Sequence, residues 1–547
     1  MSRSATAIVI AAWLVLAAIV VGVLVPPDGE PGLNYDEAFL GQQARDFLEP
    51  ERQTTHPPSE RSTFLFGRRF PLRNAAYLGA LKPQLLIPAF AVFGPDLHTL
   101  RMATLGTALL ALLFAALWAR RAFGLPTALL GATLVASDPA FVFFGACEWG
   151  PYTTLLLCRC AGLYLLTAGW QNRRGWIVAA GALVMGLGVY ARADFVIIGV
   201  AAAAGLVAAR GRVLLAEMRE RPGTVLAAAV ALVVGSLPML LSAIDLLSVG
   251  SGIADRGDLD YRARVLWSTL DGSYYYRVID LGGLFERLFE RSAPVGMLGF
   301  GVGAALVAAC VRGVRGTSRD GGGASSRAGL VFLAVTVAVL GVAMLALPGA
   351  VRAHHMLNLM PFTHLLLALL LVDLGRRSGA ARLLAGAIAV AIVASNLWVV
   401  SETRALVAET GGRGRYSNAL DAFAEELTAD PGATAVSLDW GFHETLQFLT
   451  RENRLEEPIW VLPNLLARGR PWVHRGDASH HYLVFAPRYD LFGLGPKLLE
   501  AARALPPEDV RIREHTDREG ETVFYSIRFM RPHQLVFGGR FEVRFLP

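Results

Sequence analysis

Residues 5–25 read ATAIVIAAWLVLAAIVVGVLV, with Arg3 before them and Pro26 and Pro27 after them. An uninterrupted apolar run of this length is what a helix needs to cross the ~30 Å hydrocarbon core of a bilayer. Similar runs recur along the 547 residues, of which 54% are hydrophobic and 18% charged, and the mean hydropathy is +0.45. These features exclude a soluble enzyme and predict a polytopic membrane protein. Because no small-residue cleavage pattern follows the first run, we expect an uncleaved anchor.

The distribution of arginine predicts how the chain is threaded through the membrane. Further apolar runs lie at 98–119, 126–144, 151–169, 176–190, 195–209, 224–244, 293–311, 329–347, 356–373 and 383–401. With the first run they predict about 11 transmembrane helices. Arginines cluster in alternate loops, and such loops face the cytoplasm. We therefore expect a cytoplasmic N-terminus and an external C-terminal tail. The net charge of +6 comes with no zinc-finger, helix-turn-helix or RNA-binding pattern, so we expect no nucleic-acid partner.

The composition changes sharply after the last apolar run. Residues 1–401 predict an α-helical transmembrane catalytic domain, whose first outer loop, 26–97, carries helices on the membrane surface near 37–47 and 81–93. Residues 402–547 alternate strand-like and helix-like patterns. We therefore expect a polytopic α-helical membrane protein with a C-terminal, extracytoplasmic α/β domain.

Compact acidic and basic side chains gather at the predicted outer turns. The first outer loop contains Asn34-Tyr35-Asp36-Glu37, so two carboxylates begin a helical stretch beside a largely apolar protein. A carboxylate there carries a desolvation penalty unless something uses it. The other outer candidates are Lys82, Glu148, Arg192, Arg352 and His355. Because these residues come from separate helices, they predict a cavity that opens outward.

Lys82 is unusual in this composition. Of the 51 basic residues, only Lys82 and Lys497 are lysines. A lysine kept in the first outer loop indicates that a compact ammonium group is needed there. The structural alternative is a lysine that extends from the end of an interfacial helix to the membrane surface.

Each of the other candidates also has a structural alternative. Asp36 is a suitable N-cap for the helix that follows it, and Glu148 is a suitable partner for an arginine. Arg159 lies inside a predicted span and needs a polar partner within the bundle. His354 and His355 are adjacent, so on a helix they point in different directions and make a poor metal pair.

The cysteines give no indication of a metal site. Cys158 and Cys160 are separated by one residue, whereas paired zinc ligands normally have two to four residues between them. We expect no cofactor and favour a metal-independent reaction, with a divalent metal as the alternative.

Several of these residues stand in motifs that resemble a known family. The segment Tyr35-Asp36-Glu37-Ala38 resembles the first-loop motif of GT-C glycosyltransferases, in particular the protein O-mannosyltransferase and lipid A aminoarabinose transferase group. Leu81-Lys82-Pro83, Phe93-Gly94-Pro95 and Leu100-Arg101 are similar to that group's second block, in the same order. The resemblance covers residues 1–200 well and 348–361 loosely.

The resemblance implies an enzyme that takes a hexosyl or pentosyl group from a polyprenyl-phosphate donor. It transfers the sugar with inversion to an extracytoplasmic lipid, glycan or protein acceptor, and the enzyme resides in the bacterial inner membrane. Asp36 is then expected to be the general base, with Glu37 and Glu148 as further catalytic acids. The residues expected to bind the donor phosphate are Lys82, Arg192, Arg352 and His355.

Three other classes of protein remain alternatives. A transporter or lipid flippase fits less well, because no inverted repeat appears and the polar residues gather at one face rather than at the bilayer midplane. A polysaccharide polymerase that uses lipid-linked sugars does not account as well for the early acidic pair. A surface-binding protein that acts through its tail is the non-enzymatic alternative.

Overall fold

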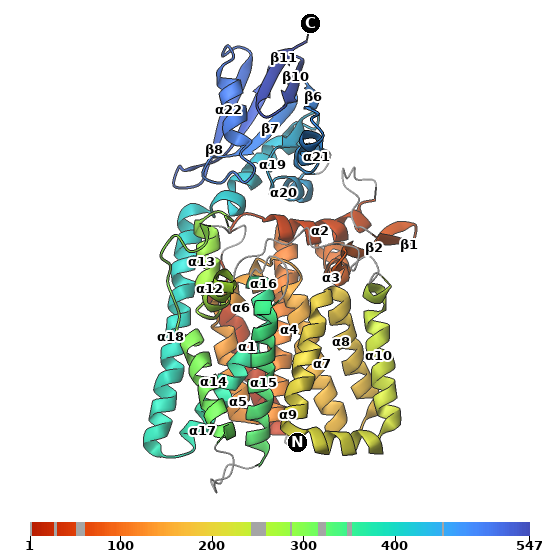
Figure 1. Cartoon of the computed structure of the whole chain (residues 1–547), viewed down its shortest axis with the longest axis vertical. Coiled ribbons are helices and arrows are strands. Elements are labelled where there is room, and N and C mark those ends of the chain that lie inside the picture. Colours follow the sequence, from red (N-terminus) through yellow and green to blue (C-terminus); the bar gives the residue numbers. More distant parts are fainter. Residues whose placement is uncertain are drawn as a thin grey trace.

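Long apolar helices build the larger part of the molecule (Figure 1). The computed structural model describes residues 3–26, 30–50, 61–241, 259–284, 287–314, 324–346, 353–450 and 453–546. The helices of the bundle are α1 (Arg3–Ile19), continued by η1 (Val20–Leu24), α4 (Leu97–Phe123), α5 (Leu125–Ala136), α6 (Pro139–Ala146), α7 (Tyr152–Gln171), α8 (Gly175–Ala191), α9 (Val196–Glu220), α10 (Pro222–Leu240), α14 (Leu298–Val314), α15 (Ala324–Ala346), α17 (Phe362–Gly375) and α18 (Gly379–Thr410). Each predicted apolar run therefore contains a helix.

Not all of these helices are long enough to span a bilayer alone. In the described part of the chain, seven are long and apolar enough to cross a membrane, or eight if α5 and α6, bent by 62°, form one span. Shorter apolar helices, including α8, α14 and α17, lie among them. The chain is thus a multi-pass membrane protein, and the count of eleven spans stays a prediction.

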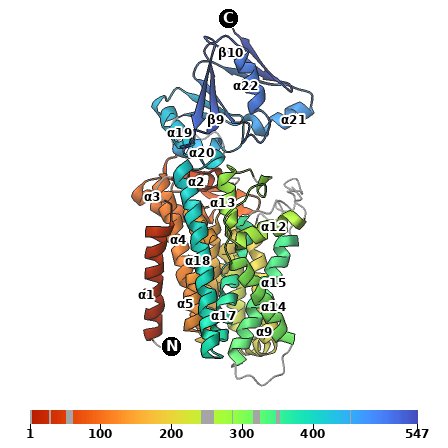
Figure 2. The same ribbon diagram turned by 90° about the vertical axis from the view of Figure 1, so that its left-hand side faces the viewer.

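A thin layer of structure covers the end of the bundle opposite the N-terminus (Figures 1 and 2). It contains α2 (Tyr35–Leu48), α3 (Leu81–Phe93) and a small antiparallel sheet of β1 (Arg61–Leu65), β2 (Arg68–Ala75) and β3 (Leu78–Gly79). Helices thus occur at both positions expected in the loop 26–97, and their placement on a membrane surface stays a prediction. Short helices α12 (Leu259–Leu270), α13 (Ser273–Asp280) and α16 (Ala353–Met356), followed by the turn η4 (Leu357–Leu359), lie at the same end of the bundle.

The C-terminal domain is an α/β unit, as predicted. Its main sheet has the order β5-β4-β7-β9-β8, with β4 parallel to its neighbours β5 and β7 and the remaining pairs antiparallel. A second sheet has the order β11-β10-β6. The elements are α19 (Ala419–Ala429), β4 (Thr434–Ser437), α20 (His443–Leu449), β5 (Arg454–Glu456), α21 (Leu462–Ala467), β6 (Trp472–Gly476), β7 (His480–Phe485), α22 (Gly495–Arg503), β8 (Val510–Thr516), β9 (Thr522–Phe529), β10 (His533–Phe537) and β11 (Phe541–Phe545).

Helix α18 joins the two parts without a flexible break. It runs from Gly379 to Thr410, so the domain boundary expected at residue 401 falls inside a continuous helix. The helix ends at Gly411, whose φ of 69° is left-handed and therefore suits glycine. The C-terminal domain follows directly and rests on the layer that contains α2 (Figure 2).

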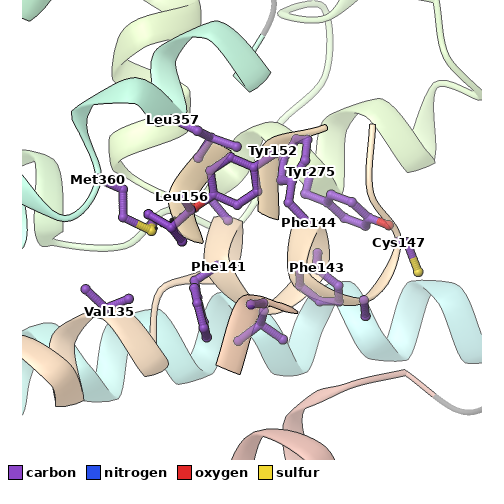
Figure 3. Close-up of a cluster of buried hydrophobic side chains, with 14 of the residues drawn as sticks. Val135, Phe141, Phe143, Phe144, Cys147, Tyr152, Leu156, Tyr275, Leu357 and Met360 are labelled. Atoms are coloured by element: carbon purple, nitrogen blue, oxygen red, sulfur yellow. Dashed lines mark hydrogen bonds between the residues drawn. The ribbon is translucent and has the colours of Figure 1, made fainter. Parts of the chain in front are cut away.

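A cluster of buried hydrophobic side chains, several of them aromatic, joins α6, α7 and α13 (Figure 3). Tyr275 of α13 stacks on Phe143 of α6, with ring centroids 4.5 Å apart, and on Trp149 at 4.9 Å. Tyr152 of α7 lies in the same cluster beside Met360. Because aromatic side chains bury large areas and lose few rotamers, the cluster makes a rigid base for the turns above it.

Candidate functional site

Helix α2 brings the two adjacent carboxylates to the end of the bundle opposite the N-terminus. Its N-cap is Asn34, whose side-chain oxygen accepts a hydrogen bond from the Glu37 amide at 3.2 Å. Asp36 lies inside the first turn, so the interpretation of Asp36 as an N-cap is wrong. Asp36 is half-buried, whereas Glu37 is 1% exposed. The two neighbours therefore occupy different environments, because successive residues of a helix point in different directions.

Glu37 is committed to an arginine. Its carboxylate pairs with the guanidinium of Arg101, from Nε at 2.9 Å and from Nη2 at 3.1 Å. Arg101 also donates to the carbonyl of Pro31 at 2.8 Å. This two-pronged contact ties the first turn of α2 to the first turns of α4, and such pairs fix orientation as well as charge. The geometry favours a positioning role for Glu37.

Lys82 and Glu148 form a second buried pair. The Lys82 ammonium, 3% exposed, contacts the carboxylate of Glu148, which is fully buried, and donates to Thr104 Oγ1 at 3.2 Å. The other oxygen of Glu148 accepts from the Thr153 amide and, at 2.9 Å, from its hydroxyl. The partner expected for Glu148 was an arginine; the structure supplies Lys82 instead. The interpretation of Lys82 as a lysine that reaches for the membrane surface is also wrong.

The two pairs are neighbours. Arg101 and Thr104, three residues apart, lie on the same face of α4 and contact Glu37 and Lys82 respectively. Burial lowers the pKa of the Lys82 ammonium to about 7, and the nearby Glu37 carboxylate opposes this shift. An anion that binds beside Lys82 favours its charged form. The lysine is thus suited to receive a negative group.

Arg192 lies under the small sheet of the outer layer. It is 5% exposed, its Nε lies 3.2 Å from Asp194, and its backbone forms a β-bridge with Leu78. The next amide, of Ala193, donates to the carbonyl of Tyr77 at 3.0 Å. This turn is therefore held against the β2–β3 hairpin by its backbone.

The segment that carries the histidines is held from within the bundle. His354 and His355 are half-buried on α16, with ring centroids 4.3 Å apart, and Arg352 lies outside the described residues. Arg159, fully buried in α7, donates to the carbonyls of Leu357 and Asn358, at 3.2 and 3.0 Å, and to the Asn358 side chain at 3.0 Å. The polar partner that Arg159 needs is thus the backbone just after α16. A fixed backbone there fixes where His355 can lie.

The C-terminal domain reaches the same layer. The hydroxyl of Tyr35 donates to Glu444 of α20 at 3.0 Å, and its ring lies 4.8 Å from that of Trp440. Burial and the Glu444 carboxylate raise the pKa of Tyr35 well above its usual value. Burial also raises the pKa of Asp421 in α19 to about 7, while Arg101 opposes the shift. The two neighbours of Asp36 are therefore held by other elements: Tyr35 contacts α20 of the C-terminal domain, and Glu37 contacts α4 of the bundle.

Sequence reasoning missed several of these contributors. Arg101 was noticed only as part of a motif, and Thr104 and Thr153 were not singled out. A usable signal for Arg101 was its position in the first turns of an otherwise apolar helix, where a guanidinium needs a carboxylate partner. Within the described residues, no three His, Cys, Asp or Glu side chains are grouped as metal ligands. The buried carboxylates have cationic side chains as partners instead.

Comparisons with known proteins agree with this architecture. Residues 84–240 match the family of dolichyl-phosphate-mannose-protein mannosyltransferases. The search of curated proteins gives no significant match. Among solved structures, ArnT from Cupriavidus metallidurans bound to undecaprenyl phosphate aligns with a TM-score of 0.55 and 12% identity, over 96% of this chain and 98% of that one.

The oligosaccharyltransferase of Archaeoglobus fulgidus shares the fold as well. Its complex with Zn and sulfate aligns with a TM-score of 0.53 and 15% identity, over 82% of this chain and 62% of that one. The same enzyme, AglB, in complex with an inhibitory peptide and a dolichol-phosphate gives a TM-score of 0.51 at 14% identity, with 83% and 64% covered. Residues 84–240 thus resemble the protein mannosyltransferase family, and the chain shares its fold with ArnT and with the archaeal oligosaccharyltransferase.

Proposed function

We propose that this protein is a glycosyltransferase that moves a sugar from a polyprenyl-phosphate donor to an acceptor hydroxyl outside the cytoplasm. The observation that carries the proposal is the contrast among the three acids. Glu37 and Glu148 are fully buried in ion pairs, whereas Asp36 is half-buried at the start of the helix that crosses the outer end of the bundle. A general base must reach a substrate proton, and Asp36 is the acid whose exposure allows it.

The reaction is a single displacement. The carboxylate of Asp36 takes the proton of the acceptor hydroxyl, and the resulting oxygen attacks the anomeric carbon of the sugar. As that bond forms, the bond from the anomeric carbon to the phosphate oxygen breaks, and the polyprenyl phosphate leaves with the bonding electrons. Because attack comes from the side opposite the phosphate, the configuration at the anomeric carbon inverts.

Cationic side chains stabilise the departing phosphate. Lys82 is the central one, since its ammonium is buried and held by Glu148 and Thr104. Charge that develops on the phosphate in a poorly solvated site is stabilised strongly by a fixed cation. The other proposed phosphate ligands are Arg192, Arg352 and His355.

The comparisons support the donor class. ArnT binds undecaprenyl phosphate and AglB binds a dolichol-phosphate, and both share the fold of this chain. We infer a bacterial inner-membrane location, with the site and the C-terminal domain on the extracytoplasmic side. The reaction is proposed to need no metal, because Glu37 and Glu148 are already neutralised by Arg101 and Lys82. Activity should therefore survive treatment with EDTA.

The substitution Asp36→Asn tests the base. We expect the variant to fold and insert normally but to lose at least ~10²-fold in turnover, because a general base typically contributes that much. The measurement is transfer from a panel of polyprenyl-phosphate sugars by the purified protein, with hydrolysis of the donor as a second readout.

The matched control is Glu49→Gln at the other end of the same helix. Glu49 pairs with Arg45 at 2.9 Å, so this variant also removes a carboxylate from α2, away from Asp36. It should keep near-normal turnover. Full activity in Asp36→Asn would contradict the assignment of the base, and no turnover of any lipid-linked sugar by the native protein would contradict the function itself.

A further inference from the structure

The C-terminal domain contains a cavity of about 210 Å³ that is separate from the layer around α2. It lies between the C-terminal end of α19 and one face of the main sheet. Its polar lining consists of Glu426, Asp430, His481, Arg511, Arg513, Ser526 and Arg528, and Phe423 and Leu427 form an apolar wall. Three guanidinium groups thus meet in one small space.

The strand register makes this an unusual concentration of positive charge. Arg511 of β8 lies directly opposite Arg528 of β9, and Arg513 lies opposite Ser526. Directly opposed side chains of an antiparallel pair have Cβ atoms ~5 Å apart, and like charges in that arrangement are destabilising. Such a pair is expected where an anion between the two guanidinium groups offsets the repulsion.

The hydrogen-bonding state of the lining leaves capacity for a ligand. Arg513 pairs with Glu426 at 2.7 Å, and Arg528 donates to the carbonyl of Ala478 at 2.9 Å. Within the described residues Arg511 has no hydrogen bond or ion pair, and the buried Nδ1 of His481 has no hydrogen-bond partner. Buried polar atoms are nearly always paired with protein, water or ligand, so the Nδ1 atom of His481 and the exposed guanidinium of Arg511 are available to a group that enters the cavity.

The lining also contains acceptors beside the donors. The carboxylates of Glu426 and Asp430 are able to accept hydrogen bonds from hydroxyl groups, and the Ser526 hydroxyl is able to do the same or to donate. Guanidinium groups match the geometry of phosphate and carboxylate. We propose that this cavity is a binding site for a saccharide that bears an anionic group, with the phosphate or carboxylate on Arg511 and Arg528 and the sugar hydroxyls on Glu426 and Asp430.

Binding measurements on the full-length protein in nanodiscs test this site. The probes are glucose 6-phosphate, glucuronate, inorganic phosphate and glucose. The binding of each probe is measured by calorimetry at low salt. We expect the two anionic sugars to bind, and glucose to bind at least about ten-fold more weakly, because hydrogen bonds to charged groups are the stronger ones. Whichever of the two anionic sugars binds with the higher affinity shows whether the site prefers a phosphate or a carboxylate. Equal affinity for inorganic phosphate and glucose 6-phosphate would overturn the saccharide part of the proposal.

Substitutions separate the cavity from the rest of the protein. Arg511→Gln, on the edge strand β8, should weaken the binding of anionic sugars about ten-fold. The midpoint temperature of its thermal unfolding without ligand should be no lower than that of the native protein, since a like-charge contact is removed. Glu426→Gln should tighten the binding of inorganic phosphate. The matched control Arg475→Gln removes an exposed guanidinium from β6, outside the cavity, and should change nothing.

The result that would overturn the site is equal affinity for anionic sugars in the native, Arg511→Gln and Arg475→Gln proteins, or no binding at millimolar concentration. The proposal does not depend on the transferase reaction. Asp36→Asn protein should bind the same sugars as the native protein, so a failure of the proposed function and a failure of this site give different results.

Discussion

At the scale of single residues, the buried pair of Lys82 and Glu148 links stability to function. The ammonium lies against the carboxylate and also donates to Thr104, and Thr153 donates to the other oxygen of the carboxylate. A pair of this kind resists the loss of one member much more than the loss of both, because a single survivor is a buried, uncompensated charge. Stability and catalysis can therefore be separated by substituting one member or both.

Lys82→Met should abolish transfer and lower the free energy of unfolding by about 3–5 kcal/mol, since Glu148 is left buried without its partner. The double variant Lys82→Met/Glu148→Gln should recover most of the stability but none of the activity, because the phosphate still lacks the Lys82 ammonium. Thermal unfolding and transfer assays on the three proteins distinguish the two contributions. Recovery of activity in the double variant would show that Lys82 has only a structural role.

At the scale of elements, α2 is held by the C-terminal domain as well as by the bundle. Phe448 of α20 packs into the small core that α2 shares with α3 and α4, made of Leu33, Ala38, Ala44, Leu86, Phe90, Leu100 and Phe448. A β-carbon on Gly41 would lie 2.8 Å from the Phe448 ring, so this glycine permits the close approach of α2 and α20. The helix that carries Asp36 thus depends on residues from both domains.

Phe448→Ala should destabilise the protein by about 3–5 kcal/mol and also reduce transfer, because the space left by the lost ring lies against α2. Phe541→Ala is the control: Phe541 is buried in the same domain, in the sheet away from α2. It should destabilise the domain to a similar extent but leave transfer unchanged at temperatures where the domain is folded. Equal activities of the two variants would contradict the dependence of α2 on α20.

The main sheet of the C-terminal domain should be sensitive to acid. Burial lowers the pKa of His515 and that of His481 to about 4, and neighbouring arginines add to the shift. Since the folded pKa values lie below the unfolded value of about 6.5, the unfolded state binds more protons between pH 6.5 and 4, and stability falls as the pH falls through this window. For His515, 7% exposed, the loss is on the order of 3 kcal/mol.

Thermal unfolding of the full-length protein from pH 7 to pH 4 measures this loss. His515→Gln should flatten the pH dependence, because glutamine retains hydrogen-bonding ability toward Ser526 without a titrating group. An unchanged pH profile in the variant would show that the acid sensitivity arises elsewhere.

At the scale of the whole molecule, the direction of threading is open to a direct test. We expect an impermeant maleimide to label Glu508→Cys in intact cells, and to label Gly379→Cys only after permeabilisation, because loops rich in arginine stay inside. Both positions are exposed, and Cys310, the exposed native cysteine among the described residues, would first be replaced. The opposite labelling pattern would turn the proposed site toward the cytoplasm.

The sequence was sufficient for the architecture and less so for the pairing within the site. Apolar runs and alternating stretches reflect burial of whole faces, so helices such as α4 and strands such as β9 were predicted. Ion pairs such as that between Lys82 and Glu148 join residues far apart in the chain, and neither spacing nor periodicity encodes such a contact. The role of Asn34 was missed for a local reason: two suitable capping residues, Asn34 and Asp36, stand two positions apart, and only the backbone geometry distinguishes them.

The contact between α2 and α20 also bears on how the protein is made. Tyr35 and Glu444 are 409 residues apart in sequence, and ribosomes add ~5–20 residues per second, so roughly 20–80 s separate the synthesis of the two sides. During that interval the first helices are already made, but the packing of α2 against α20 is incomplete. A nascent chain with the proposed activity is therefore expected to remain inactive until its C-terminal domain has folded.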